Sequence, residues 1–141
     1  MAKDIIDIYN YLGVKRKNNV WSWGISCADY IILQVWQDES EKTESGLAFC
    51  VQRTRAENYD SSPGYKERQE HLEEHRLGKP CYLLVCHAKD DSQLAPRAMD
   101  RFNEKDFFVS NGVFTENEYG DLLLCCEERI PITEVRARHA K

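Results

Sequence analysis

The chain has 141 residues, of which 42% are apolar, 11% aromatic and 30% charged, and its formal net charge is −5. This length and composition favour a single globular domain and exclude a collagen-like or largely disordered chain. The apolar runs are far shorter than the roughly 20 residues that a membrane-spanning helix needs, and no apolar signal stretch precedes Ile5. We therefore expect a cytoplasmic protein without a membrane partner.

The cysteine and histidine pattern favours neither disulfides nor a metal centre. The six cysteines have no Cys-x-x-Cys spacing, and in a cytoplasmic protein we expect them to be reduced. His71 and His75 have the spacing of one helix face, but the glutamates around them favour a solvated face over a zinc site. We therefore expect no metal and no cofactor.

The apolar pattern changes between helical and strand periodicity along the chain. Ile5, Ile8 and Leu12 have the spacing of one helix face, and Gly13 stands where a helix commonly ends. Segments rich in β-branched and aromatic residues, such as 29–37, predict strands. In chain order, the predicted elements are a helix over 4–12, strands over 20–24, 29–37 and 46–53, a helix over 65–77, a strand over 81–86, a helical turn over 96–102, and strands over 107–114 and 120–128.

The polar segments complete the predicted organisation. The acidic stretch 38–45 is predicted as a loop. The helix over 65–77 is expected to bury three apolar anchors and to expose its charged residues. Residues 134–141 are predicted as a flexible basic tail, which leaves one domain over 1–133. The anchors of the helix are Tyr65, Leu72 and Leu77.

The predicted elements define a fold class. About five or six strands are combined with two or three helices, and regular β-α-β alternation is missing. This favours an α+β fold, with a curved β-sheet or a small open β-barrel and two or three packed helices. A doubly wound parallel sheet is disfavoured.

Lysine, arginine and asparagine stand directly beside tryptophan in residues 15–24. Cations bind phosphates, indole rings stack on flat bases, and amides can pair with a base edge. An alternative remains open, in which the tryptophans fill the core and the basic run is a solvated turn. The expected phosphate-binding residues are Lys15, Arg16 and Lys17, with Lys89 and Arg97 across the mouth of the site, and the expected base-binding residues are Trp21, Trp23, Trp36, Asn18 and Asn19.

The same segment carries a family resemblance. Residues 11–24 (YLGVKRKNNVWSWG), followed by 31–39, resemble a module found in bacterial modification-dependent restriction systems, and 64–78 fit the same pattern. The resemblance covers roughly residues 8–128 and is similar in outline to the PUA-like superfamily, which includes SRA, EVE and YTH domains. It implies a curved β-barrel with crossing helices and an aromatic pocket for a modified base.

These observations favour a binding module over an enzyme, because neither a phosphate loop nor a nucleophile paired with a base is evident in the sequence. We expect a non-catalytic module that recognises a modified nucleobase in DNA or RNA, with a separate nuclease or other protein as a candidate partner. The alternative is a small acidic protein–protein interaction module, an inhibitor or adaptor in phage–host defence. It would engage a basic partner through the acidic residues of 38–44 and 67–74.

Overall fold

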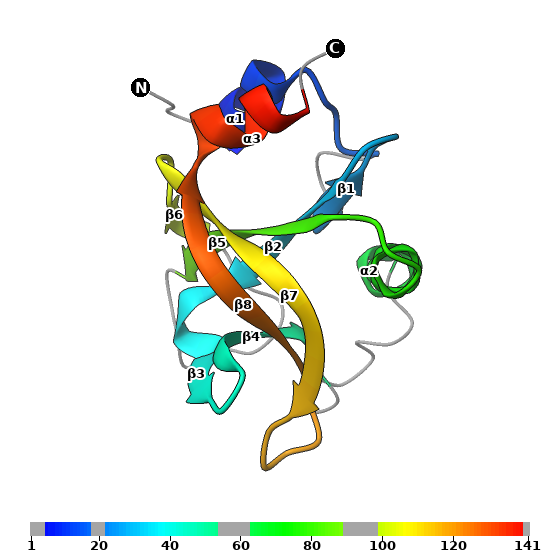
Figure 1. Ribbon diagram of the computed structural model, residues 1–141, viewed down its shortest axis with the longest axis vertical. Helices are drawn as coiled ribbons and strands as arrows, with labels where there is room; N and C mark the ends of the chain where they lie inside the picture. Colours follow the sequence, from blue (N-terminus) through cyan, green and yellow to red (C-terminus); the bar gives the residue numbers. More distant parts are fainter. Residues whose placement is uncertain (1–4, 18–21, 54–62, 89–98, 140–141) are drawn as a thin grey trace.

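The computed structural model describes residues 5–17, 22–53, 63–88 and 99–139, which form three α-helices, one short 3-10 helix and eight strands (Figure 1). In chain order, the elements are α1 (Ile5–Leu12), β1 (Gly24–Ser26), β2 (Ile31–Trp36), the 3-10 helix η1 (Gln37–Glu39), β3 (Ser40–Thr43), β4 (Gly46–Gln52), α2 (Pro63–Arg76), β5 (Cys81–Ala88), β6 (Met99–Phe102), β7 (Asp106–Glu116), β8 (Leu122–Pro131) and α3 (Ile132–Arg138).

The described strands belong to one mixed sheet with the order β1-β2-β5-β7-β8-β4-β3, and β6 pairs with β5 beside this path. The pairing of β2 with β5 is parallel, from Ile31 opposite Cys81 to Trp36 opposite Cys86, and the other pairings are antiparallel. The long strands β7 and β8 bend as they cross the molecule (Figure 1). The predicted α+β class is confirmed, and the sheet is not closed into a barrel.

Helices cover the sheet in two places. In Figure 1, α1 and α3 lie together at one end of the molecule, and α2 lies apart from them, where it contacts β1, β2 and β4. Alternating residues of β2 and β5 face two different apolar clusters, so both faces of these strands are buried and their sequences are continuously apolar. The cluster under α1 and α3 includes Ile8, Tyr9, Ile32, Leu84, Phe107, Ile130 and Val135. The cluster under α2 includes Leu33, Val35, Phe49, Val51, Leu72, Leu83 and Leu124.

Most predicted elements are present in the structure. The predicted helices over 4–12 and 65–77 correspond to α1 and α2, and the predicted strands over 29–37, 46–53, 81–86, 107–114 and 120–128 correspond to β2, β4, β5, β7 and β8. Within the described residues, no helix is both long and apolar enough to cross a membrane.

The chain after β8 differs from the prediction. Residues 132–138 form α3, whereas the sequence predicts a flexible tail from residue 134. Ile132 and Val135 stand three residues apart and are both buried against the cluster under α1. Two anchors on one short helix are too few to produce a visible periodicity in the sequence.

Three other segments also differ from the prediction. The acidic stretch predicted as a loop contains η1 and the strand β3. The strand expected over 20–24 is wrong at its described end, because β1 begins only at Gly24 and Trp23 precedes it. Residues 99–102 form β6 rather than a helical turn, since they pair with the end of β5.

The anchors of α2 give a test of the packing. Leu72 is 1% exposed and Leu77 is 83% exposed, so Leu77 is not the anchor that the sequence predicts. We expect Leu72→Ala to lower the free energy of unfolding by about 2–5 kcal/mol, and Leu77→Ala to change it by less than about 0.5 kcal/mol. Urea unfolding of both variants measures this difference, and equal losses would contradict the placement of α2.

Candidate functional site

An open cavity of about 450 Å³ lies between α2, the loop that follows α1, and the turn between β1 and β2. Its volume falls in the range typical of small-molecule sites. The cavity is lined by Lys15 and Lys17 from the loop, by Ile25, Ser26, Cys27 and Ala28 from the β1–β2 hairpin, by Glu67, Glu70, His71 and Glu74 from α2, and by Lys79. Its lining is therefore polar and carries charges of both signs.

Carboxylates dominate the wall that α2 contributes. Glu67 is buried, and its Oε2 accepts a hydrogen bond from the Ser22 hydroxyl at 3.1 Å. Burial raises the pKa of Glu67, although the hydrogen bond from Ser22 and the charge of Lys17 oppose this shift. Residues 67, 70, 71 and 74 share one face of the helix because they are separated by three or four positions. The helix therefore directs acceptor groups toward the loop that carries the lysines.

Glu74 belongs to a compact polar contact at the edge of the cavity. Its Oε1 accepts hydrogen bonds from the Ser26 hydroxyl and from Lys79 Nζ, each at 3.0 Å, and Lys79 Nζ also lies 2.8 Å from Ser26 Oγ. Partial burial alone would raise the pKa of Glu74, but the hydrogen bonds from Lys79 and Ser26 outweigh it and lower that pKa. This contact ties the C-terminal half of α2 to β1.

His71 is 6% exposed, and its Nδ1 has no hydrogen-bond partner in the part of the chain that the structure describes. Burial, helped by the positive charge of Arg68, lowers the pKa of His71 to about 4. The imidazole is therefore neutral near pH 7. A carboxyl with a raised pKa and an imidazole with a lowered one, both in a single cavity, are typical of functional sites.

His75 has a different environment, although it shares the helix with His71. Its Nδ1 lies 2.7 Å from the carbonyl oxygen of Lys79, and its Nε2 lies 2.7 Å from the Ser110 hydroxyl on β7. The solvated face expected for the two histidines is therefore wrong, because His71 is buried and His75 contacts β7. Across residues 5–17, 22–53, 63–88 and 99–139, no three His, Cys, Asp or Glu side chains are grouped so that they could hold a metal ion.

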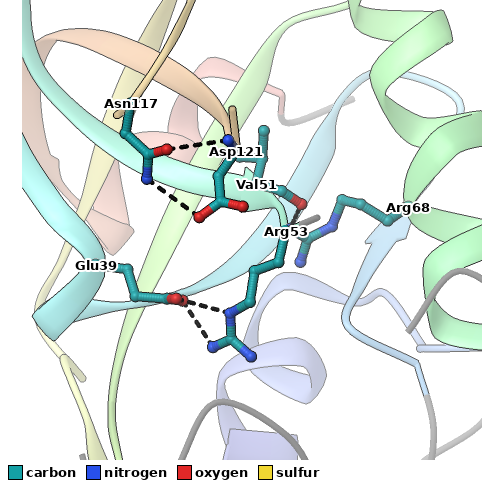
Figure 2. A network of polar contacts seen from close by, with 6 residues as sticks. All are labelled: Glu39, Val51, Arg53, Arg68, Asn117 and Asp121. Atoms are coloured by element: carbon teal, nitrogen blue, oxygen red, sulfur yellow. Dashed lines mark hydrogen bonds and ion pairs between the residues drawn. The ribbon is translucent and has the colours of Figure 1, made fainter. Parts of the chain in front are cut away.

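Arg68 holds α2, which forms one wall of the cavity, against the sheet. Its side chain is 3% exposed, and Figure 2 shows the contact in which Nη1 donates to the carbonyl oxygen of Val51 at 2.9 Å. Nη2 donates to the carbonyl oxygens of Trp23 at 2.9 Å and Gln34 at 2.7 Å. One guanidinium therefore joins α2 to β4, to β2 and to the residue that precedes β1.

The structure brings part of the predicted site together. Lys15 and Lys17 are exposed and line the cavity. Arg16 turns away from it, because its Nη1 donates to Gln34 Oε1 at 3.3 Å and its guanidinium lies 5.3 Å from the centre of the Tyr9 ring. The basic loop therefore divides into two residues at the cavity and one that anchors the loop to β2.

The described tryptophans do not line the cavity. Trp23 is half-buried, and the Arg68 guanidinium lies 5.8 Å from the centre of its ring. Trp36 is half-buried at the end of β2, where it packs against the cluster under α1 and α3. The other predicted site residues lie outside the described part of the chain, namely Asn18, Asn19, Trp21, Lys89 and Arg97.

Sequence reasoning does not select Glu67, Arg68 or His71 as site residues. The sequence nevertheless indicates that Arg68 and His75 face the protein. Arg68 stands four positions before Leu72, and His75 stands three positions after it. A helix that buries Leu72 must also turn these two positions toward the protein. Since α2 has few apolar residues, its packing depends on polar contacts.

A second polar cluster lies beneath η1, outside the cavity. Arg53 Nε and Nη2 contact the two carboxylate oxygens of Glu39, each at 2.7 Å, and both side chains are more than nine-tenths buried (Figure 2). The fully buried Asp121 accepts a hydrogen bond from the Asn117 amide at 3.1 Å. Glu39 is therefore not part of a solvated acidic loop, as the sequence suggests. The ion pair joins η1 to the residue that follows β4, and the Asn117–Asp121 hydrogen bond closes the turn between β7 and β8.

No family model, curated protein or solved structure matches this chain. The geometry of the cavity is therefore the basis for inferring a function.

The buried His71 predicts a pH-dependent stability. An unfolded histidine takes up a proton near pH 6.5, whereas folded His71 does so only near pH 4. Between these values the unfolded state binds more protons, so stability falls as the pH falls. From pH 7 to pH 4, we expect the wild type to lose up to about 3 kcal/mol more than His71→Gln. Urea unfolding at several pH values measures this, and parallel pH curves would contradict it.

Arg68 gives a second prediction. Arg68→Met keeps the apolar stem but removes every donor to the three carbonyls, so we expect the free energy of unfolding to fall by about 3 kcal/mol or more. Arg76→Met on the same helix removes a guanidinium from the surface, where its side chain is 45% exposed, and should cost less than about 1 kcal/mol. Thermal and urea unfolding compare the two variants. Equal small losses would show that Arg68 does not hold the helix.

Proposed function

We propose that this protein is a nucleic-acid-binding module that takes a nucleobase into the cavity beside α2. The observation that carries the proposal is the pairing of this cavity with Lys15 and Lys17. Both lysines are exposed, and neither has an ion pair with any described residue. Two available cations beside a cavity of this size suit a ligand that combines a flat polar ring with phosphates.

The charge distribution supports local rather than general binding. The net charge of −5 opposes nucleic acid over most of the surface. Lys15 and Lys17 stand two positions apart on the loop, so they can contact phosphates on either side of one nucleotide. Because such contacts release counterions, they make binding depend on salt. A single nucleotide held at one place is the expected mode.

The family resemblance of the sequence also supports this proposal. Residues 8–128 resemble the PUA-like superfamily in outline, and we extend the proposal to this fold family and to a modified base as the preferred ligand. The Arg68 contacts give α2 a fixed position against the sheet. A wall held in this way supports selection between similar bases, because selection requires a preorganised site.

The alternative function, an acidic protein–protein module, loses part of its basis. The sequence places Glu67 and Glu74 on an acidic surface, but both are hydrogen-bonded at the cavity. Glu39 is buried in an ion pair with Arg53. The acidic surface is therefore smaller than the sequence suggests, and the geometry favours the nucleic-acid reader.

The lysines provide the test. We expect the double variant Lys15→Gln/Lys17→Gln to bind short fluorescent single-stranded DNA or RNA more weakly than the wild type. The slope of log affinity against log salt should fall by about 0.7 for each phosphate that the variant no longer neutralises. Fluorescence anisotropy over a range of salt concentrations measures both effects.

The matched control is Lys42→Gln/Lys105→Gln, which removes the same charge from exposed positions outside the cavity. This control should keep the affinity and slope of the wild type, apart from a small change due to net charge. An equal effect of both double variants, or the absence of binding by the wild type, would overturn the proposed function.

A further inference from the structure

We infer that the nucleic acid is bound as a single strand, which continues from the cavity onto the surface where α1 and α3 meet and stacks a second base on Tyr11. This inference rests on the proposed function and extends its ligand beyond one nucleotide. The cavity still takes one base, and the neighbouring base of the same strand lies outside it.

Tyr11 presents an aromatic ring on the surface of α1. It is 41% exposed, whereas Tyr9 on the same helix is 1% exposed. The buried residues of α1 are Ile5, Ile8 and Tyr9, so Tyr11 lies on the opposite side of the helix. An exposed flat ring offers a surface on which a base can stack, and this stacking does not depend on the identity of the base.

Arg136 adds a cation to this ring. Its guanidinium carbon lies 4.7 Å from the centre of the Tyr11 ring. Arg136 is exposed and has no ion pair with any described residue, whereas Arg138 contacts Glu128 and Glu134. Arg136 is therefore the arginine of α3 that is available to a phosphate. Together, Tyr11 and Arg136 form a stacking platform.

The stacking platform lies beside the loop that carries the lysines of the cavity. α1 and α3 lie together at one end of the molecule (Figure 1). Gly13 ends α1 in the left-handed conformation, with φ of 75°, and the N–H of Val14 donates to the carbonyl oxygen of Tyr9 at 2.9 Å. The chain leaves the helix at this cap, and Lys15 follows Tyr11 by four residues, which span at most about 14 Å. One strand can therefore reach both places.

The charges around the stacking platform set the direction of this strand. Asp7 is exposed and stands four positions before Tyr11, on the same face of α1. Its carboxylate repels a phosphate at that end of the helix. Lys15 stands four positions after Tyr11 and lines the cavity. A strand that lays a base on Tyr11 therefore places the adjacent phosphates toward Lys15 and Arg136.

A duplex does not suit this arrangement. When one base is flipped out of a duplex, its neighbours stay stacked within the helix, so their faces are closed to a protein side chain. Stacking on Tyr11 needs a neighbouring base that is unpaired. Duplex DNA also carries one negative charge for about every 1.7 Å of its axis, which a protein with a net charge of −5 offsets poorly.

The experiment measures the fluorescence anisotropy of a labelled oligothymidylate of about ten nucleotides. We expect Tyr11→Ala to bind it at least about fivefold more weakly than the wild type, which corresponds to about 1 kcal/mol, because one stacked base contributes at least this much. Tyr11→Phe keeps the ring and should stay within about twofold of the wild type. Arg136→Gln should lower the slope of log affinity against log salt by about 0.7.

A second measurement uses the same oligothymidylate paired with oligoadenylate. We expect the wild type to bind the single strand at least about tenfold more tightly than this duplex, which corresponds to about 1.4 kcal/mol. Tyr11→Ala should reduce this preference, because the variant loses a contact that only the single strand makes.

The matched control is Tyr119→Ala, which removes a ring that is 55% exposed in the turn between β7 and β8. This variant should keep the affinity of the wild type. Equal affinity of Tyr11→Ala and the wild type, an equal loss in Tyr11→Phe or Tyr119→Ala, or tighter binding of the duplex overturns the inference. The proposed function then stands if Lys15→Gln/Lys17→Gln still weakens binding. Failure of the wild type to bind either probe overturns both.

Discussion

The guanidinium of Arg68 is the contact on which the arrangement of the site depends. The sheet is not closed, and β2 and β4 approach each other without pairing. The boundary between these two strands is called the seam here. Carbonyl oxygens at this seam need donors, since unpaired buried acceptors are costly. Arg68 donates to Val51 on one side of the seam and to Gln34 and Trp23 on the other. By holding the seam, it also holds α2, and with it the acidic wall of the cavity.

The polar character of α2 explains why this protein has a cavity at all. A helix with a wide apolar face would pack flat against the sheet and leave little space. In α2, Leu72 provides an apolar contact, while Glu67, Arg68 and His75 reach the rest of the protein through hydrogen bonds. These long polar side chains leave room between α2 and the β1–β2 hairpin. The groups that hold the helix are therefore neighbours of the groups that line the cavity.

The cavity combines two electrostatic environments at short range. One side carries exposed lysines and the other carries carboxylates, with a neutral imidazole between the charged groups of α2. Such a division suits a ligand that is itself divided, with an anionic backbone and a ring that donates hydrogen bonds. It suits a simple anion less well, because the carboxylates would repel it. The proposed function relies on this division, because two lysines at one place can contact phosphates although the net charge of the protein is −5.

Local sequence patterns were sufficient for β2, β4, β5, β7 and β8 and for the existence of α1 and α2. Apolar runs such as 81–86 specify a strand buried on both faces, and the run 15–17 places basic residues on a loop whatever the fold. Tertiary structure was needed for the docking of α3, the burial of Glu39 and the inward turn of His71 and Arg68. The physical reason is that these side chains find their partners far away in the sequence, as Arg68 does with Trp23. The local pattern shows which residues are polar, but it does not show which of them will have a partner in the interior.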